Sequence, residues 1–166
     1  MKPLIIAAAV ILAVAAVLLI ARERTWATII GPADLGPVDF ATLSRPATPN
    51  SWLVCPPGYC RNYPPDAQPP VFNIPAAALR SAVQANWQQM PRTRIVASTT
   101  SGSGEIRFVQ YSALLGFPDT ISVQTVAIDE THSTLAVYSR SQVGQSDLGA
   151  NKLRMEKWLA TLKPAT

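Results

Sequence analysis

Hydrophobic residues form one uninterrupted run at the start of the chain and alternate with polar residues further on. Residues 4–21 read LIIAAAVILAVAAVLLIA and carry no charged or polar side chain. At about 1.5 Å per helical residue the run reaches roughly 27 Å, just enough to cross a bilayer core. A buried core helix normally has a polar face, and this run has none. The pattern therefore predicts a single transmembrane helix within residues 1–24.

A cleaved signal peptide and an uncleaved signal anchor both begin with such a run. Signal peptidase requires small residues just before its cleavage point, after the apolar region. Here the Ala-x-Ala choices lie inside the run, and Arg22, Glu23 and Arg24 follow directly, so the sequence favours an anchor. Lys2 on one side nearly balances Arg22 and Arg24 on the other, so the positive-inside rule does not give the orientation by itself.

Alternating apolar and polar residues predict four strands, over residues 94–99, 106–112, 120–128 and 134–140. Helical spacing predicts a helix on either side of these strands. The first covers residues 73–90, with Asn73 as N-cap and an apolar stripe of Leu79, Val83, Trp87 and Met90. The second follows an N-cap at Ser146 or Asp147, and its stripe is Met155, Trp158, Leu159 and Leu162. Arg154 lies off this stripe, where we expect solvent to hydrate it.

The order α-β-β-β-β-α predicts an α+β domain over residues 73–166, with a four-stranded antiparallel sheet and two helices on one face. The face under the helices is apolar, with Ile106, Phe108, Ile121, Val123, Leu135 and Val137. The other face carries Arg107, Tyr111, Tyr138 and Arg140, a mixture that is unusual for a solvent-exposed face. It is either a groove for an acidic or amphipathic ligand or partner, or a surface that another part of the chain covers. The second interpretation is favoured, with Arg107 or Arg140 paired to an acid such as Asp119, because an uncovered sheet face usually finds a cover.

Prolines separate the apolar start from this domain. Eleven of the fifteen lie between residues 31 and 75, so no helix runs through that stretch. Residues such as Phe40, Trp52 and Leu53 make it too apolar for a disordered linker. We expect residues 25–72 to form an extended segment that packs on the domain. A docking strip for a partner is the alternative, but no PxxP run with basic flanks stands out.

Cys55 and Cys60 are the only cysteines, and they flank a Pro-Pro-Gly turn that brings them close together. In an exported domain such a pair indicates a disulfide. Half of a metal site is the competing interpretation, but it needs further ligands, and the single histidine, His132, is distant in the sequence. We therefore predict a disulfide, no metal, and a domain in the periplasm, held at a bacterial inner membrane.

The stretch 139–162 joins the last predicted strand to the last helix. Its loop is either an ordinary strand-to-helix connection or an anion site, in which the free N–H groups of the helix and Arg140 would bind the ligand. Asp147 would occupy the place that an anion needs, so the structural interpretation is favoured.

The block SRSQVGQSDLGAN (residues 139–151), with FPDT at 117–120, resembles the signature of a bacterial and plastid family known as a domain of unknown function, DUF1499. The similarity extends, more weakly, over residues 31–60, and the Ser-Arg-Ser, Asp-Leu-Gly and Asn elements fall at 139–141, 147–149 and 151. It covers most of the chain after the apolar start. The resemblance implies no particular reaction.

Charge and motifs exclude several classes of function. The net charge of +4 is modest and its basic residues are scattered, which disfavours nucleic-acid binding. Neither GxxxxGK[ST] nor GxGxxG occurs, and His132 lies in a predicted turn rather than beside a nucleophile. No set of catalytic residues and no cofactor is indicated.

Two hypotheses about function follow. The favoured one is a membrane-tethered, non-catalytic domain that binds a ligand or protein of the cell envelope. Its candidate contacts are Arg140, Asp147 and Asn151 at the loop, and Arg107, Tyr111 and Tyr138 on the adjoining sheet face. The alternative is an envelope hydrolase with Asp119 or Asp147 as acid or base and Arg140 as charge stabiliser.

Overall fold

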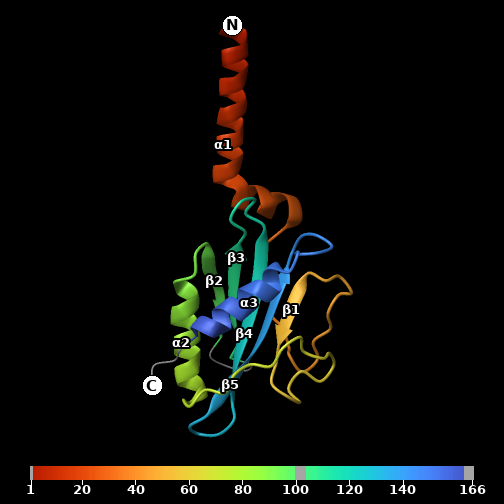
Figure 1. Cartoon of the computed structure of the whole chain (residues 1–166), viewed down its shortest axis with the longest axis vertical. Coiled ribbons are helices and arrows are strands. Elements are labelled where there is room, and N and C mark those ends of the chain that lie inside the picture. Colours follow the sequence, from red (N-terminus) through yellow and green to blue (C-terminus); the bar gives the residue numbers. More distant parts are fainter. Residues whose placement is uncertain (1, 100–103, 163–166) are drawn as a thin grey trace.

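The alternating residues form one antiparallel sheet, and the helical stripes form two helices against it (Figure 1). The structure, a computed structural model, describes residues 2–99 and 104–162 of the 166-residue chain. Its elements in chain order are α1 (Lys2–Ile30), β1 (Ser51–Val54), α2 (Ala76–Gln88), β2 (Thr93–Ser98), β3 (Ile106–Tyr111), β4 (Pro118–Ala127), β5 (Ser133–Ser141) and α3 (Ala150–Thr161). The α+β prediction and the antiparallel sheet are confirmed.

The sheet has five strands in the order β1-β5-β4-β3-β2, so the prediction of four strands is wrong. The additional strand, β1, lies in the proline-rich segment and pairs with β5 from Ser51 opposite Arg140 to Val54 opposite Val137. It has only four residues, with Pro49 and Pro56 close to its two ends. Such a short run between prolines is a weak strand signal, although prolines are tolerated beside an edge strand.

Helix starts differ from the prediction in their capping. The first turn of α2 begins at Ala76 after Pro75, and no side chain caps it, so the expected Asn73 cap is wrong. Proline suits this position because its missing N–H would have no partner in the first turn. Before α3, Gly149 adopts a left-handed conformation, and the Asp147 carboxylate accepts a hydrogen bond from Asn151 N at 2.8 Å. Asp147 therefore caps the helix from two positions before the N-cap residue, Gly149.

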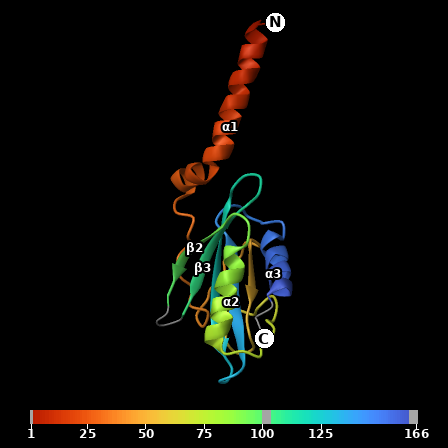
Figure 2. The same cartoon turned by 90° about the vertical axis from the view of Figure 1, so that its left-hand side faces the viewer.

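The main core lies between the sheet and the two helices, which Figures 1 and 2 show on one face. All six residues predicted for the apolar face are buried there, against Leu79, Val83 and Trp87 of α2 and Met155 and Trp158 of α3. The Trp87 ring lies 5.2 Å from that of Phe108 and 5.1 Å from that of Trp158. Large aromatic contacts of this kind join both helices to the middle of the sheet.

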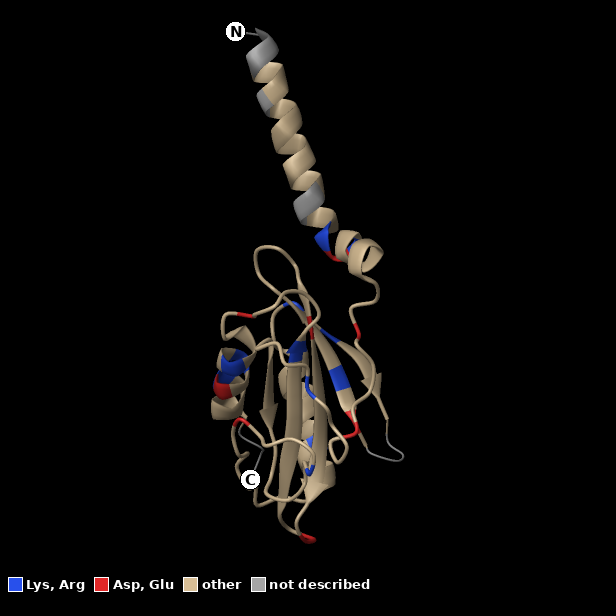
Figure 3. Cartoon of the chain, turned by 90° about the vertical axis from the view of Figure 1, so that its right-hand side faces the viewer, with Lys and Arg blue, Asp and Glu red and all other residues tan. Residues whose placement is uncertain are grey.

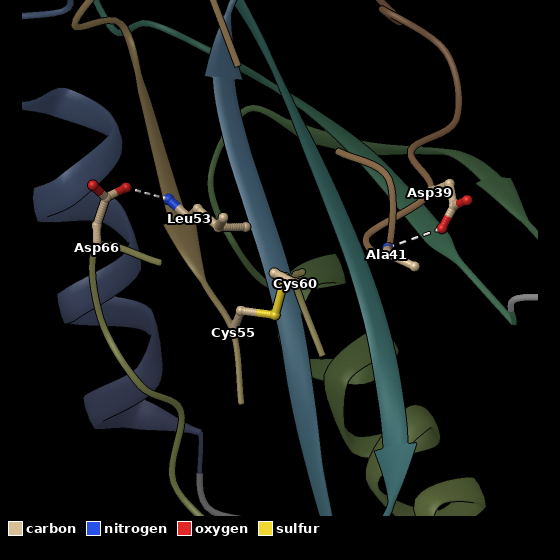
Figure 4. Close-up of a disulfide and its surroundings, with 6 residues drawn as sticks. All are labelled: Asp39, Ala41, Leu53, Cys55, Cys60 and Asp66. Carbon is tan, nitrogen blue, oxygen red and sulfur yellow. Dashed lines mark hydrogen bonds between the residues drawn. A yellow bond between two sulfur atoms is a disulfide. The ribbon is translucent and has the colours of Figure 1, made fainter. Parts of the chain in front are cut away.

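The opposite face is covered by the proline-rich segment. Val38, Phe40 and Leu43 form a second core with Ala136 and Tyr138 of β5. The Cys55–Cys60 disulfide is present, with its Cα atoms 6.2 Å apart, and Cys55 belongs to the same core (Figure 4). The segment thus packs on this face of the sheet.

An ion pair fixes this cover. Arg107 binds Asp34 through Nη2 at 3.0 Å and Glu105 through Nη1 at 2.9 Å. The prediction that Asp119 pairs with Arg107 or Arg140 is wrong. Asp119 points to the helix side of the sheet, where it binds Arg154. The reason is the two-residue period of strands, which places Asp119 and Thr120 on opposite faces.

The N-terminal helix α1 projects from the domain and bends near its charged residues (Figures 1 and 3). In the described part of the chain, no single helix has the length and apolar character needed to cross a membrane. The bent pair Ile5–Val17 and Ile20–Ile30, which meet at 66°, has them when taken together.

Acid should weaken the cover through Asp34. Burial raises the pKa of this carboxyl, but hydrogen bonds from Arg107 and Gly36 and the charges of Arg107 and Arg140 outweigh that effect, so its pKa lies below the ordinary value. The stabilisation is therefore complete above the unfolded-state pKa, about 3.9, and is lost as the pH falls through the lower folded-state value. We expect the difference in unfolding free energy between wild type and Asp34→Asn to be constant above about pH 5 and to shrink below about pH 4. Urea titrations at several pH values would measure it; a difference that grows towards acid would contradict this assignment.

Candidate functional site

The loop between β5 and α3 lies where three parts of the chain converge: the end of β5, the start of α3 and the residue before β1. Ser139 and Ser141 are two residues apart in β5 and both bond towards α3, because side chains alternate along a strand. Asn151 lies in the first turn of α3 and is completely buried. A buried amide is costly unless its polar atoms have partners, so its contacts define how this region is built.

Asn151 uses both ends of its amide. Its Nδ2 donates to Asn50 O at 3.0 Å, to Ser141 Oγ at 2.9 Å and to Asp147 Oδ2 at 2.7 Å. Its Oδ1 accepts from Ser139 Oγ at 2.5 Å and from Arg154 Nη1 at 2.6 Å. The side chain therefore joins β5, α3, the loop and the entry to β1 at a single point.

Arg154 continues this network across the sheet. Its Nε donates to Gln110 Oε1 at 2.5 Å, its Nη1 to Ser139 Oγ at 3.0 Å, and its Nη2 to the Asp119 carboxylate. The side chains of Arg154 and Asp119 are 10% and 8% exposed, so the expected hydration of Arg154 is wrong. We call the set Gln110, Asp119, Ser139, Asn151 and Arg154 the polar hub.

The hub also positions the loop. Asp147 accepts from Gly149 N at 2.9 Å through Oδ1 and from Asn151 N and Nδ2 through Oδ2. A carboxylate at this position interacts favourably with the free N–H groups and partial positive charge of the α3 N-terminus. Asp147 thus occupies the place where the anion-site hypothesis put a ligand.

The next residue, Leu148, is the most exposed large hydrophobic side chain of the described residues, at 96%. Its φ is +52°, a left-handed conformation that costs a non-glycine residue about 1–2 kcal/mol. The conformation is held from both sides, since Leu148 N donates to Ser146 Oγ at 3.2 Å and Asp147 is fixed by Asn151. Packing alone would favour a leucine that is buried and has a relaxed backbone, and Leu148 has neither property.

Leu148 stands between two hollows of about 390 Å³ each, and Ser146, Asp147 and Leu148 line both. The hollow towards β1 is also lined by Arg45, Trp52 and Lys152, and the hollow towards β4 by Phe117, Asp119 and Ser141. The loop is therefore a ridge with a polar and aromatic depression on either side. We call this loop, residues 142–149, the Leu148 ridge.

The structure distributes the six candidate contact residues over three places. Asp147 and Asn151 lie at the ridge. Arg140 lies on the other face of the sheet, where it donates to Leu35 O at 3.1 Å and Gly36 O at 2.7 Å and its guanidinium is 5.6 Å from the Tyr138 ring. Burial lowers its pKa from the ordinary value.

Arg107 and Tyr138 share that covered face. Tyr111 lies apart from them at the end of β3, where Arg94 approaches its ring to 5.6 Å and burial raises the pKa of its hydroxyl. A ligand at the ridge would therefore touch only Asp147 of the six residues, because Asn151 is completely buried.

The hydrolase hypothesis also depends on geometry. Asp119 and Asp147 do line one hollow, but Arg154 pairs with the first and the α3 backbone with the second. The exposed pair His132 and Asp129 lies in the turn after β4. There, hydrogen bonds from the Thr131 backbone and His132 lower the pKa of Asp129 to about 2. No group of three or more His, Cys, Asp or Glu side chains among residues 2–99 and 104–162 is placed to hold a metal ion.

Sequence reasoning missed Arg154, Gln110 and Asn50. A signal was present for the hub, because Asn151 precedes Met155 by four residues and Trp158 by seven, which places an amide on the apolar stripe. Leu148 had no such signal, since a left-handed leucine cannot be recognised from its neighbours.

Two comparisons with known proteins bear on this region. The model of a family described as "Protein of unknown function (DUF1499)" matches residues 42–162, which include β1, the whole sheet and the ridge. No curated protein matches the sequence. The match also confirms the resemblance carried by residues 139–151.

Replacement of Arg154 should test whether the hub holds the fold. In Arg154→Met the Asp119 charge stays buried without its partner, so we expect a loss of about 3–5 kcal/mol in the free energy of unfolding. The double variant Asp119→Leu/Arg154→Met removes both charges and should lose less. Lys157→Met, on the exposed side of the same helix, is the control and should change stability by less than about 0.5 kcal/mol. Urea unfolding measures all three; equal effects of Arg154→Met and Lys157→Met would contradict the structural role.

Proposed function

This chain belongs to the DUF1499 family, and from that premise we propose that it is a membrane-anchored, non-catalytic recognition domain of the bacterial cell envelope. Its N-terminal apolar helix holds it at the inner membrane, and its α+β body lies in the periplasm. The body binds an envelope protein through the Leu148 ridge.

The support for the anchor is the character of α1. Its apolar side chains face outward around the helix, as Val10, Ile11, Leu12, Val14 and Val17 are all exposed. A helix that is apolar all round is stable in lipid or against other apolar surface, and not in water. The support for the periplasm is the Cys55–Cys60 disulfide, because such bonds persist in oxidising compartments.

The observation that carries the binding proposal is Leu148. The hub and the Asp147 cap hold this side chain out in a conformation that costs free energy, and nothing within the described chain covers it. Strain of this kind persists where the surrounding structure holds it, and it is concentrated at functional sites. An aliphatic side chain between two shallow hollows suits a protein surface with a complementary apolar pocket.

Catalysis is less well supported. The polar groups beneath the ridge bond to one another, and a general acid or base needs a group that is able to exchange its proton with a substrate. Arg140, the charge stabiliser of the hydrolase hypothesis, donates to the proline-rich segment on the opposite face. We therefore do not propose the hydrolase.

The location can be tested through the cysteines. Membranes are prepared in the presence of an alkylating reagent, denatured, and then labelled with a maleimide of high mass with and without reduction. We expect a mass shift only after reduction, because the bond forms outside the cytoplasm. In intact spheroplasts, external protease should remove the body. Cysteines that are already alkylated, or a body that protease reaches only after lysis, would contradict the periplasmic location.

The ridge can be tested with a photo-crosslinking residue at position 148 in intact membranes. We expect a discrete crosslinked product from position 148 and none from position 153. Leu153 is the control because it is also an exposed leucine, and it lies on α3 away from the ridge.

A substitution tests the same surface. Leu148→Gly should keep the melting temperature within a few degrees, since glycine adopts this φ without strain, and should lose the function measured by complementation of a deletion strain. Leu153→Gly is not a matched control because it breaks a helix, so Leu153→Ser serves instead. Equal products from both positions, or a functional Leu148→Gly, would overturn the proposal.

A further inference from the structure

The hairpin between β3 and β4 carries two exposed leucines at its tip. Leu114 is 73% and Leu115 49% exposed, although hairpin tips usually hold polar residues or glycine. Hydrogen bonds close the turn itself: Ser112 N donates to Phe117 O at 2.9 Å, and Phe117 N donates to Ser112 Oγ at 2.9 Å. The leucines are therefore presented by a defined turn and do not project from a loose loop.

The same hairpin is attached to α1. Arg22 Nη1 donates to the carbonyls of Ala113 and Leu114, both at 2.9 Å, and Trp26 Nε1 donates to the carbonyl of Leu115 at 2.7 Å. The Trp26 ring lies 4.6 Å from that of Phe117.

Gly116 makes this approach possible. A Cβ atom there would come within 2.7 Å of the Arg22 side chain, and its φ is +67°. Three successive carbonyls of the tip thus bond to α1, and the hairpin is held at the height of Arg22 and Trp26.

That height is where the apolar part of α1 ends. Arg22 is the first charged residue after the uncharged run 4–21, and Figure 3 shows the charged residues that follow this run at the bend of α1. Trp and Arg are the residues that characteristically lie at the boundary between lipid and water. Figure 1 shows the hairpin reaching from the sheet to this bend. In a chain anchored by α1, the two leucines lie at the level of the lipid headgroups.

We propose that the β3–β4 hairpin is a second membrane contact, in which Leu114 and Leu115 enter the boundary between headgroups and acyl chains of the bilayer that holds α1. This inference rests on the proposed membrane anchoring. Arg22 and Trp26 set the depth of the hairpin, and the exposed Arg24 adds attraction to anionic headgroups. Because α1 already holds the domain at the surface, a contact of two side chains suffices. The contact fixes the tilt of the body, so that the sheet stands away from the membrane.

The experiment uses full-length protein in vesicles of phosphatidylethanolamine and phosphatidylglycerol, with its disulfide intact. Single variants Leu114→Cys and Leu115→Cys carry the fluorophore NBD. The matched control is Ile128→Cys, another exposed aliphatic residue, at the opposite end of β4. A fourth variant, Val14→Cys, reports on the proposed span itself. Melting temperatures before labelling show that each variant is folded.

We expect NBD emission at positions 114 and 115 to shift to the blue and to be quenched by lipids with a nitroxide close to the headgroup. At position 128 neither effect is expected. Solvent-like emission at 114 and 115, with quenching at position 14 by lipids that carry the nitroxide deep in the acyl chain, would overturn the hairpin contact and leave the anchor intact. An absence of this deep quenching at position 14 as well would overturn the anchor. A blue shift at 114 and 115 without lipid quenching would show that a second copy of the chain covers the hairpin, and would also overturn the proposal.

Discussion

The hydrogen bonds of the buried Asn151 amide determine how the parts of this domain meet. Its donors and its acceptor bond to groups from the β1 entry, β5, the loop and α3. Any other packing of α3 would leave at least one of these atoms buried and unpaired, at about 1–3 kcal/mol each. Apolar packing is non-directional and would tolerate a range of positions for the helix. The amide and the Arg154–Asp119 pair reduce that range to one.

The two faces of the sheet are covered by different kinds of structure, two helices on one side and the proline-rich segment on the other. On the helix side, α2 and α3 satisfy most of their own backbone hydrogen bonds, and the hub orients α3 and positions the loop before it. On the other side, the part of the proline-rich segment that precedes β1 covers the sheet without forming a strand, and each of its prolines lacks an N–H donor. Side chains of the sheet therefore satisfy its carbonyls. Arg140 donates to Leu35 O and Gly36 O, and Gln142 to Ile30 O and Pro32 O.

This division explains how far the sequence could be interpreted. Period-two patterns locate β2 to β5 to within two residues, and the stripe Leu79, Val83 and Trp87 locates α2, since these signals are local and repeated. In the four residues of β1 the alternating pattern is too short to be recognised, and the partner of this strand lies far along the chain in β5. The disulfide was predictable because two cysteines five positions apart leave only one pairing.

The candidate site was predicted as a region and not as a set of contacts. The ridge lies within the block 139–151. Side chains alternate between the two faces along β5, however, so Arg140 lies on one face while Ser139 and Ser141 lie on the other. Asp147 was recognised as a cap through its chemistry. Arg154 was misplaced because a charged residue one position from an apolar stripe is usually solvated, and its partner Asp119 comes from a strand thirty-five positions earlier. Such non-local ion pairs cannot be obtained from helical spacing.

The hub and the Leu148 ridge are parts of one arrangement. A residue in a left-handed conformation relaxes unless its surroundings over-determine it. Here Asp147 is fixed by Asn151, and Gly149 provides the second left-handed position, so the exposed leucine between them has no freedom to turn inward. Buried polar bonds are a weak means of adding net stability, but they are an effective means of specifying one geometry. Their directional bonds therefore hold Leu148 in place at the surface, which a purely apolar contact beneath α3 could not do.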